Sequence, residues 1–420
     1  MFGLSFVSLN LIVGCASVVP YDSSHLEDVK ESSEVVQVEQ QDSVYEEDVQ
    51  EDTGEIEEEI DPDYCPQGGV WPDPLWQVDL PENRGMSSEI LEQAALYAEE
   101  NQSDCMVVVK DGYIVGEWYW NNTSPFDKVK SWSVGKSYAA TAVGLAYDQG
   151  FIESTDQSVA DFIPQWQGTE KEFITIQHML SMTSGLRFNM IEDNLLMAYA
   201  NDMTQRTLES PLENVPGALW EYNNHTVQIS EPLIRNATGM NAEELMREYL
   251  WEPIGIDAVW SKDDQGQPAM FMNVRASCRD QARFAYLYLN NGCWNGERIL
   301  SQEWVDKSLT PSSPQNQGYG YWWWLNGGTP TLDSVTFEAH EDMLHPNAPE
   351  DAFCAVGLGS QMVEVVPSED LIIVRFGPAP HENLSLWIQQ NGAVMDALMN
   401  DGKQIVHNGI LERVLESIVD

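Results

Sequence analysis

The sequence Ser133-Val134-Gly135-Lys136, continued by SYAATAVGLAY at residues 137–147, predicts the central helix of this protein. The residues after Lys136 are small and mostly apolar, which is typical of a helix buried in a core, and the pattern ends near Gly150. If the helix begins near Ser133, positions 133 and 136 lie on one face and their side chains are neighbours. The Lys136 amine can then take the Ser133 hydroxyl proton, provided that burial lowers the lysine pKa toward neutrality. The stretch therefore predicts a serine–lysine pair suited to acyl transfer.

Two other motifs overlap these residues, and both depart from their usual patterns. Gly135-Lys136-Ser137 is similar to the end of a phosphate-binding loop, but Lys130 stands where that motif needs a glycine. Ser131-Trp132-Ser133-Val134-Gly135 half-matches the nucleophile elbow of α/β-hydrolases, with Ser131 in place of the first glycine. We therefore do not expect nucleotide binding, and a Ser-His-Asp hydrolase remains a secondary alternative. A chance match with a surface lysine is the non-functional alternative.

The charge of the chain is strongly negative and argues against a nucleic-acid partner. Its 420 residues carry a formal net charge of −48, which would repel phosphate. Residues 16–65 hold 18 acidic residues and one lysine, so the 50 acidic and 19 basic residues of 66–420 still leave a balance of −31. A hydrophobic content of 43% is ample for a core. We expect a globular domain with an acidic, solubilising surface and no bound nucleic acid.

The first 65 residues indicate export and a tether. Residues 1–14 form an apolar run too short to span a membrane, which we interpret as a signal peptide, although no Lys or Arg precedes it. Ile12-Val13-Gly14-Cys15 resembles a bacterial lipobox, which predicts lipidation of Cys15 and a membrane anchor in the cell envelope (periplasm or outer membrane). Residues 15–65 are acidic and poor in aromatic residues, so we expect a disordered tether before a folded domain at 66–420. Without lipidation the chain would be secreted.

The cysteines after Cys15 permit disulfides but leave at least one free thiol, because their number is odd. The pattern over residues 279–290 predicts a helix, which would hold Cys278 and Cys293 roughly 20 Å apart. A disulfide needs Cα atoms within about 7 Å, so these two are not expected to pair, and Cys278 would sooner pair with Cys354. The other cysteines are Cys65 and Cys105.

The sequence contains no motif for a metal site. No CxxC or clustered His/Cys spacing is present. His340 and His345 lie in a segment rich in Pro, Asp and Glu, where isolated histidines are more often solvated than metal ligands. We therefore expect no metal.

Hydrophobic periodicity predicts strands near both ends of the folded domain, with helices and loops between them. An Asp111-Gly112 turn would join the first two strands. This order suggests one antiparallel sheet assembled from both ends of the chain, with an inserted helical region. Strands are predicted at 105–110, 112–120, 361–366 and 371–376, and helices at 86–101, 175–182, 242–251, 302–309 and 383–399.

A second polar group follows a Pro-Gly turn in PGALWEYNN at residues 216–224. If Tyr222 lies near Ser133 and Lys136, its oxygen can pass a proton to the leaving group. The amide of Asn224 can bind the substrate carbonyl or orient the lysine. On its own a Tyr-x-Asn is commonplace, and the tyrosine could simply pack on the core.

Taken together, these motifs resemble the serine β-lactamase and penicillin-binding-protein superfamily, in the branch of class C β-lactamases, esterases and 6-aminohexanoate-oligomer hydrolases. The resemblance covers roughly residues 86–378. It implies an α+β fold of the β-lactamase/transpeptidase type, with an antiparallel sheet flanked by helices and an inserted helical subdomain as one wall of the cleft. It rests on SVGK at 133–136, ITIQHMLSMTSGL at 174–186, PGALWEYNN at 216–224, SCRDQARFAYLYLNNGCWNGERIL at 277–300 and GLGSQMVEVVPSEDLIIV at 357–374.

The resemblance also implies roles for single residues. Ser133 would be the nucleophile, Lys136 the base that activates it and Tyr222 the partner acid/base. The backbone N–H groups of Ser133 and Gln361 would form the oxyanion hole, where each donor contributes roughly 3–4 kcal/mol to transition-state stabilisation. The residues expected to contact substrate are Asn224, Gly359 and Ser360. No metal or organic cofactor is implied.

The third family motif departs from its pattern and bears on the substrate. It begins with Lys or His, which helps to fix the substrate carboxylate in β-lactamases and D-alanyl peptidases, but Leu358 stands there and offers neither charge nor hydrogen bond. A carboxylic ester or small linear amide is therefore expected as substrate of a monomeric serine hydrolase. The alternatives are a β-lactamase or D-Ala-D-Ala carboxypeptidase acting on cell-wall peptides, and a non-catalytic envelope module. The aromatic run Tyr321-Trp322-Trp323-Trp324 could line an acyl pocket or lie in the core.

Overall fold

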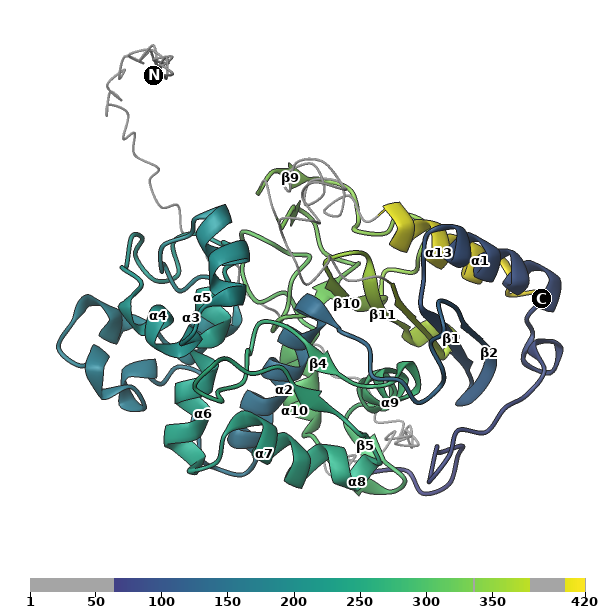
Figure 1. The fold of residues 1–420 in the computed structure, drawn as a ribbon, viewed down its shortest axis with the longest axis horizontal. Coiled ribbons are helices and arrows are strands. Elements are labelled where there is room, and N and C mark those ends of the chain that lie inside the picture. Colours follow the sequence, from purple (N-terminus) through teal and green to yellow (C-terminus); the bar gives the residue numbers. More distant parts are fainter. Residues whose placement is uncertain (1–63, 335–336, 378–404, 420) are drawn as a thin grey trace, which may run out of the picture. The chain divides into compact units, whose positions relative to one another are not determined.

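Strands from both ends of the domain form one antiparallel sheet, as predicted (Figure 1). Its order is β2-β1-β12-β11-β10-β7, and every pair of neighbours is antiparallel. Asp111 and Gly112 both have positive φ in the β1–β2 turn, as a two-residue hairpin requires. The strands of this sheet are β1 Cys105–Lys110, β2 Tyr113–Tyr119, β7 Trp324–Leu325, β10 Phe353–Gly357, β11 Gln361–Val366 and β12 Leu371–Phe376.

The structure is a computed structural model that describes residues 64–334, 337–377 and 405–419. The predicted signal peptide, Cys15, all but the last two residues of the predicted tether and the predicted helix at 383–399 lie outside the described residues. Within the described ranges, no helix is both long and apolar enough to cross a membrane.

Helices cover both faces of the sheet, and most of them lie between β2 and β7 in the sequence (Figure 1). The predicted helices at 86–101, 175–182, 242–251 and 302–309 are confirmed with small shifts of their ends, whereas the helix at the C-terminus was not predicted. The helices are α1 Ser88–Glu100, α2 Gly135–Asp148, α3 Ile176–Leu180, α4 Met203–Glu209, α5 Asn224–Gln228, α6 Ser230–Thr238, α7 Ala242–Met246, α8 Glu252–Ile254, α9 Cys278–Leu289, α10 Gln302–Ser308 and α13 Ile405–Glu416. Short strand pairs are β3 Val259–Trp260 with β4 Val274–Arg275, β5 Cys293–Trp294 with β6 Glu297–Arg298, and β8 Thr331–Leu332 with β9 Ala339–His340.

The sheet separates two hydrophobic cores because alternate side chains of each strand point to opposite faces. On β1, Cys105, Val107 and Val109 pack with α2, α9 and the helical region in the larger core. Met106 and Val108, which point to the opposite face, pack with α1 and α13 in the smaller core. The small residues predicted after Lys136 form α2, which is buried along almost its whole length. Each fully buried Val or Ile contributes roughly 1.5–3 kcal/mol to stability, so both faces of the sheet need cover.

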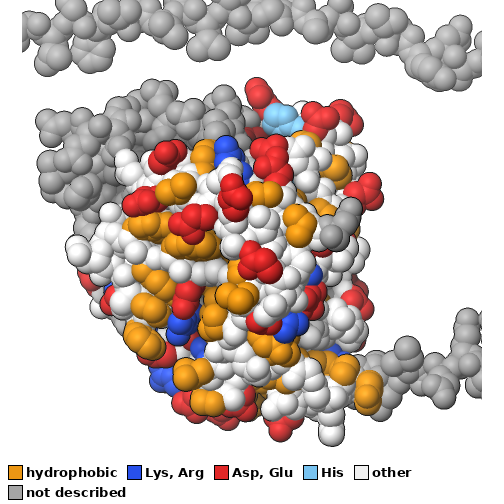
Figure 2. Space-filling view, turned by 90° about the vertical axis from the view of Figure 1, so that its right-hand side faces the viewer, with side chains coloured by type: hydrophobic (Ala, Val, Ile, Leu, Met, Phe, Trp, Pro, Cys, Tyr) orange, Lys and Arg blue, Asp and Glu red, His pale blue; other side chains and the backbone are white. Residues whose placement is uncertain are grey.

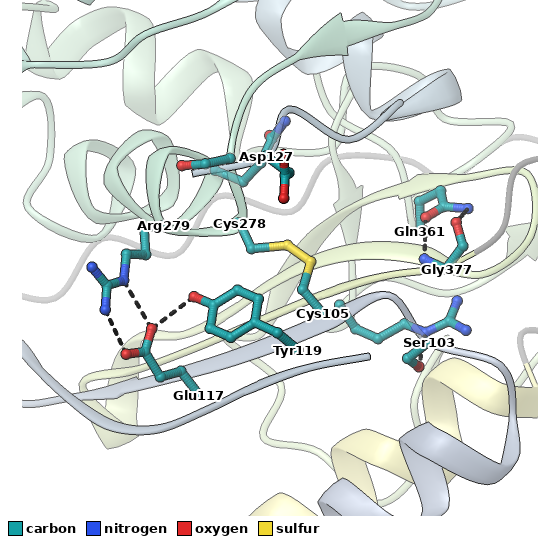
Figure 3. The surroundings of a disulfide bond; sticks show 12 residues. Ser103, Cys105, Glu117, Tyr119, Asp127, Cys278, Arg279, Gln361 and Gly377 are labelled. Carbon is teal, nitrogen blue, oxygen red and sulfur yellow. Dashed lines mark hydrogen bonds and ion pairs between the residues drawn. A yellow bond between two sulfur atoms is a disulfide. The ribbon is translucent and has the colours of Figure 1, made fainter. Parts of the chain in front are cut away.

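Two disulfides join distant parts of the chain, Cys65–Cys293 and Cys105–Cys278. The expected pairing of Cys278 with Cys354 is therefore wrong. Cys278 begins α9 and faces Cys105 on β1, as Figure 3 shows, whereas Cys354 is a buried free thiol on β10. The prediction that Cys278 and Cys293 do not pair is confirmed.

The surface of the folded domain is acidic, in keeping with its charge balance. On the face shown in Figure 2, Asp and Glu side chains are scattered among few Lys and Arg. Several of the basic side chains are held in ion pairs, for example Arg279 with Glu117 at 2.5 Å, beside the Cys105–Cys278 disulfide (Figure 3).

Candidate active site

Ser133 lies in a tight turn that leads directly into α2. The turn, η2, spans Trp132–Val134 and has 3-10 geometry. Trp132 has a φ of +48°, a left-handed conformation that costs a residue with a Cβ roughly 1–3 kcal/mol. Asn273 holds this peptide from both sides: its Oδ1 accepts from Trp132 N–H at 2.9 Å, and its N–H donates to Trp132 O at 2.9 Å. The strained turn places the half-buried Ser133 one helical turn before Lys136.

Lys136 is buried next to Ser133, as the spacing predicted. Its Nζ lies 3.0 Å from Ser133 Oγ and donates to the carbonyl oxygen of Phe271 at 3.0 Å. The side chain is 1% exposed, and this burial lowers the pKa of Lys136 to about 7. A substantial fraction of the amine is therefore neutral near pH 7 and has a lone pair available for the Ser133 proton.

Tyr222 completes the group that the sequence predicted. The Lys136 Nζ lies 4.6 Å from the centre of the Tyr222 ring. The ring is 8% exposed and stacks on Trp324 at a centroid distance of 5.8 Å. The structure thus brings Ser133, Lys136 and Tyr222 together from η2, α2 and the segment before α5.

Asp193 is a buried carboxyl group whose charge acts on Lys136. It lies in the π-helical turn η6, Glu192–Leu196, and has no exposed surface. Its carboxylate accepts from the N–H of Asn224 at 2.8 and 3.0 Å and from the N–H of His225 at 3.2 Å. Burial raises the pKa of Asp193 to about 7, and its charge in turn opposes the effect of burial on Lys136 by favouring the protonated amine.

The predicted oxyanion donors lie where β10 and β11 meet η2. Gly357, the last residue of β10, packs so closely on this turn that a Cβ there would stand 3.1 Å from Ser133 N. β11 begins at Gln361, whose side chain is turned inward: its Oε1 accepts from Gly377 N–H at 2.9 Å (Figure 3). The Gln361 side chain therefore shapes the turn, and the oxyanion role of its backbone N–H stays a prediction.

The remaining predicted substrate residues have structural contacts of their own. Gly359 and Ser360 form a left-handed turn after β10, with φ of +85° and +56°, and Arg375 donates to both of their carbonyl oxygens at 2.7 and 3.0 Å. Asn224 donates through Nδ2 to the Asp193 carbonyl at 3.0 Å. This bond fixes Asn224 against η6, so its side chain supports the buried carboxylate.

The aromatic residues Tyr321 to Trp324 are buried and belong mainly to the hydrophobic core. Trp322 and Trp323 are 1% and 0% exposed, and the Tyr321 hydroxyl donates to Gln177. Trp324 differs, since its ring packs on Tyr222 and so backs the site.

Two residues of the site were not predicted, Asp193 and Asn273. Neither belongs to a local pattern: Asp193 follows Ile191-Glu192 in an ordinary polar segment, and Asn273 ends the Met270-Phe271-Met272 loop. Asp193 acts through its charge on Lys136, 57 positions earlier in the chain, and Asn273 acts through its hydrogen bonds to Trp132, 141 positions earlier. No sequence signal would have singled them out.

The family model described as Beta-lactamase matches residues 94–383. A 6-aminohexanoate-dimer hydrolase of Paenarthrobacter ureafaciens is 22% identical over 331 residues, which cover 71% of this chain and 78% of that protein. A penicillin-binding protein homologue from Caulobacter crescentus shares the fold with a TM-score of 0.53 and 15% identity, over 70% of this chain and 92% of that one. EstCE1, a hydrolase with promiscuous acyltransferase activity, does so with a TM-score of 0.54 and 11% identity, over 76% and 98%. The family match spans more than half of the chain and agrees with the fold, and the chain therefore belongs to the β-lactamase family of serine hydrolases.

Proposed function

We propose that this protein hydrolyses a carboxylic ester or a small linear amide through an acyl-enzyme on Ser133. The observation that carries the proposal is the fully buried Lys136 amine 3.0 Å from the Ser133 hydroxyl oxygen. A lysine pKa near 7 matches what a general base needs at neutral pH, since it is partly neutral yet still basic enough to take a proton.

In the acylation step, Lys136 takes the Ser133 proton while Oγ attacks the substrate carbonyl carbon. The carbonyl oxygen becomes an oxyanion, which the backbone N–H groups of Ser133 and Gln361 would stabilise. Collapse of this intermediate breaks the bond to the leaving alcohol or amine, which receives the proton from Lys136 by way of Tyr222. In deacylation, water gives a proton to the same base and attacks the acyl carbon. The bond from the acyl carbon to Oγ then breaks, the acid leaves, and Lys136 returns the proton to Oγ, which restores Ser133.

Leu358 favours a substrate without a carboxylate next to the reacting bond. Its side chain is half-buried and apolar, and the nearby Arg375 is 2% exposed and donates to Ser103 Oγ and to backbone carbonyls. The similarity to a 6-aminohexanoate-dimer hydrolase supports a linear amide, and the likeness to the hydrolase EstCE1 is compatible with an ester. The second candidate is a β-lactamase or D-Ala-D-Ala carboxypeptidase, which the Caulobacter homologue keeps open.

A labelling experiment on the full chain tests the proposal. The protein is incubated with a fluorophosphonate, a labelled penicillin and a short p-nitrophenyl ester, and any adduct is located by mass spectrometry. We expect a fluorophosphonate adduct on Ser133 and turnover of the ester. An adduct on another serine contradicts the mechanism, efficient penicillin acylation favours the second candidate, and no reaction at all indicates a non-catalytic envelope module.

We further propose that the chain is exported as a monomeric lipoprotein anchored at Cys15. Support comes from the lipobox-like Ile12-Val13-Gly14-Cys15 and from two disulfides, which persist in oxidising compartments. Metabolic labelling with a fatty-acid analogue in a bacterial host tests the anchor. The label should be present in the full chain and lost in Cys15→Ser, and equal labelling of both would contradict it. Light scattering of the detergent-free Cys15→Ser chain should give the mass of a monomer.

A further inference from the structure

Four potential metal ligands meet on the face of the sheet opposite to α2. They come from four separate parts of the fold: the segment before β10, β10, β11 and α13. Their donor atoms all lie within 4.8 Å of one another, and all four side chains are buried. The prediction that His345 is solvated is therefore wrong, because it is 2% exposed. The four residues, called the His/Cys/Glu cluster below, are His345, Cys354, Glu364 and His407.

The backbone brings these side chains together by strand register and helix packing. Cys354 on β10 and Glu364 on β11 are directly paired, so their side chains point to the same face of the sheet. Met362 and Val366, which flank Glu364 at alternate positions of β11, belong to the smaller core under α1 and α13. His407 on α13 reaches Glu364 from above, with its Nε2 2.7 Å from Oε2.

Asn326 and Asn408 hold His345 in place. Asn326 Oδ1 accepts from the His345 N–H at 2.7 Å, and its Nδ2 donates to the His345 carbonyl at 3.1 Å. At the ring, His345 Nδ1 is hydrogen-bonded to Asn408 Oδ1, which makes Nδ1 the protonated nitrogen. The lone pair of His345 is therefore on Nε2, which faces Cys354 Sγ at 3.6 Å and Glu364 Oε2 at 3.8 Å. A histidine ligand with its other nitrogen bonded to an oxygen acceptor is the usual arrangement at metal sites.

The cluster is poorly satisfied by hydrogen bonds alone. Among the described residues, Glu364 Oε1 and His407 Nδ1 are buried without a hydrogen-bond partner. Burying such groups unpaired is costly, and native proteins keep few of them. A bound cation would take Glu364 and the Nε2 atoms of both histidines as ligands and so offset the cost of burying the carboxylate, whereas His407 Nδ1 is the ring nitrogen that does not face Glu364.

We propose that the His/Cys/Glu cluster is a structural site for a divalent transition-metal ion of the zinc class. Two imidazoles, a thiolate and a carboxylate form a ligand set that suits tetrahedral Zn²⁺. Zinc bonds of about 2.0–2.3 Å place ligand atoms roughly 3.3–3.8 Å apart, which is close to the two distances from His345 Nε2. The distance of 2.7 Å between His407 Nε2 and Glu364 Oε2 is shorter than this range because the two atoms share a hydrogen bond, which the bound ion would replace.

The charges of such a site balance. Binding releases the Cys354 thiol proton to solvent. The proton shared by Glu364 and His407 Nε2 either leaves Glu364 for solvent or moves to His407 Nδ1, so both imidazoles stay neutral and the ligands carry two negative charges against the two positive charges of the ion. The complex is then neutral, as a fully buried site requires. A cavity of about 80 Å³ borders His345 and is lined also by Asn408 and Leu411. The metal would fasten α13 and the segment around His345 to the sheet, and it would take no part in chemistry at Ser133.

Metal analysis and Co²⁺ spectroscopy of the full chain test the site. The protein carries Cys15→Ser, so that Cys354 is the one cysteine outside the two disulfides. After expression with zinc we expect about one zinc per chain. Titration of the zinc-free protein with Co²⁺ should produce the thiolate-to-cobalt charge-transfer band of a tetrahedral site, and a chelator should lower the unfolding temperature.

Single substitutions then assign the ligands. Cys354→Ser should abolish the charge-transfer band, and Asn408→Ala should weaken zinc affinity about 10- to 100-fold, whereas Asn408→Asp, which keeps the acceptor, should restore it. His340→Ala, in the exposed part of the same region, is the matched control and should bind one zinc as before. If the unsubstituted protein binds no zinc in stoichiometric amount and gives no cobalt band, the cluster is only a hydrogen-bonded network and the proposal is wrong. These readouts are independent of catalysis, so they stand whether or not the esterase proposal holds.

Discussion

Both faces of the central sheet bury ionisable side chains, but only one of them opens to solvent. On the α2 face, the buried Lys136 touches the half-buried Ser133 and is balanced by Asp193. On the α13 face, Glu364 and its neighbours are enclosed, and burial lowers the pKa of His407 to about 3. The comparison teaches that burial alone does not make a group reactive. Burial tunes the basicity of Lys136 because the Ser133 hydroxyl links that amine to the substrate, whereas burial of His407 only keeps its imidazole uncharged.

The largest expected effect tests whether the two faces act separately. Lys136→Ala should lower kcat at least about 10³-fold, because Ser133 loses the base that takes its proton. The zinc content of the α13 face should not change. Steady-state turnover of a p-nitrophenyl ester and metal analysis of the same preparation measure both. Lys307→Ala, a surface lysine paired with Glu303, is the control and should keep full activity. Retained activity in Lys136→Ala would refute its role as base.

The next effect concerns stability on the α2 face. Replacing both Cys105 and Cys278 by serine removes a covalent link between β1 and α9 that closes 173 positions of sequence. We expect a loss of about 2–5 kcal/mol in the free energy of unfolding, measured by urea denaturation. Because neither sulfur contacts Ser133, kcat of the folded fraction should change less than about twofold. A large fall in kcat at unchanged stability would place the disulfide in the active site.

A smaller effect is expected from the residue that holds the strained turn. Asn273→Ala removes the acceptor of the Trp132 N–H and frees a left-handed peptide next to the nucleophile. We expect kcat/KM to fall about 10- to 100-fold, which corresponds to roughly 1.4–2.7 kcal/mol of transition-state stabilisation. Fluorophosphonate labelling of Ser133 should slow in parallel. Asn236→Ala, on the exposed side of α6, serves as the control and should leave both rates unchanged.

The smallest effect is a shift along the pH axis. In the unsubstituted protein, kcat/KM should rise with pH and level off above an apparent pKa of about 7, as Lys136 loses its proton. The Asp193 carboxylate favours the protonated amine, so Asp193→Asn should lower the pKa of Lys136 and move the rising limb to lower pH. Glu213→Gln, on the surface, should leave the profile in place. A limb that moves to higher pH in Asp193→Asn would contradict the electrostatic role of this carboxylate.

The elements that could be predicted are those determined by residue patterns within a short stretch of sequence. Helix α2, the β1–β2 and β11–β12 pairs and the serine–lysine spacing follow from periodicity and turn residues within short windows. Tyr222 was predicted from the Tyr-x-Asn that follows a Pro-Gly turn and from its place in a family motif, and the structure places it beside Lys136.

The parts that were missed depend on contacts between distant segments. Asp193 and Asn273 act on the site only because folding brings the charge of Asp193 near enough to affect Lys136 and the side chain of Asn273 into a hydrogen bond with Trp132. The disulfide partner of Cys278 was wrong for the same reason, since the face to which each cysteine points is fixed by strand register. The His/Cys/Glu cluster has no short motif, because its members stand on two strands, a loop and a helix that was itself unpredicted.

The Cys65–Cys293 disulfide gives the molecule a mechanical property. It closes a covalent loop of 228 positions, and Ser133, Lys136 and Tyr222 all lie inside that loop. If the chain is held at its N-terminal end and pulled from the other, tension passes from Cys65 through the sulfur atoms to Cys293 and does not enter the loop. A force that unravels the C-terminal strands would remove Trp324 and Gln361 from the site, because both lie outside the loop, whereas the segment from Cys65 to Cys293, with Ser133, Lys136 and Tyr222, would carry no tension.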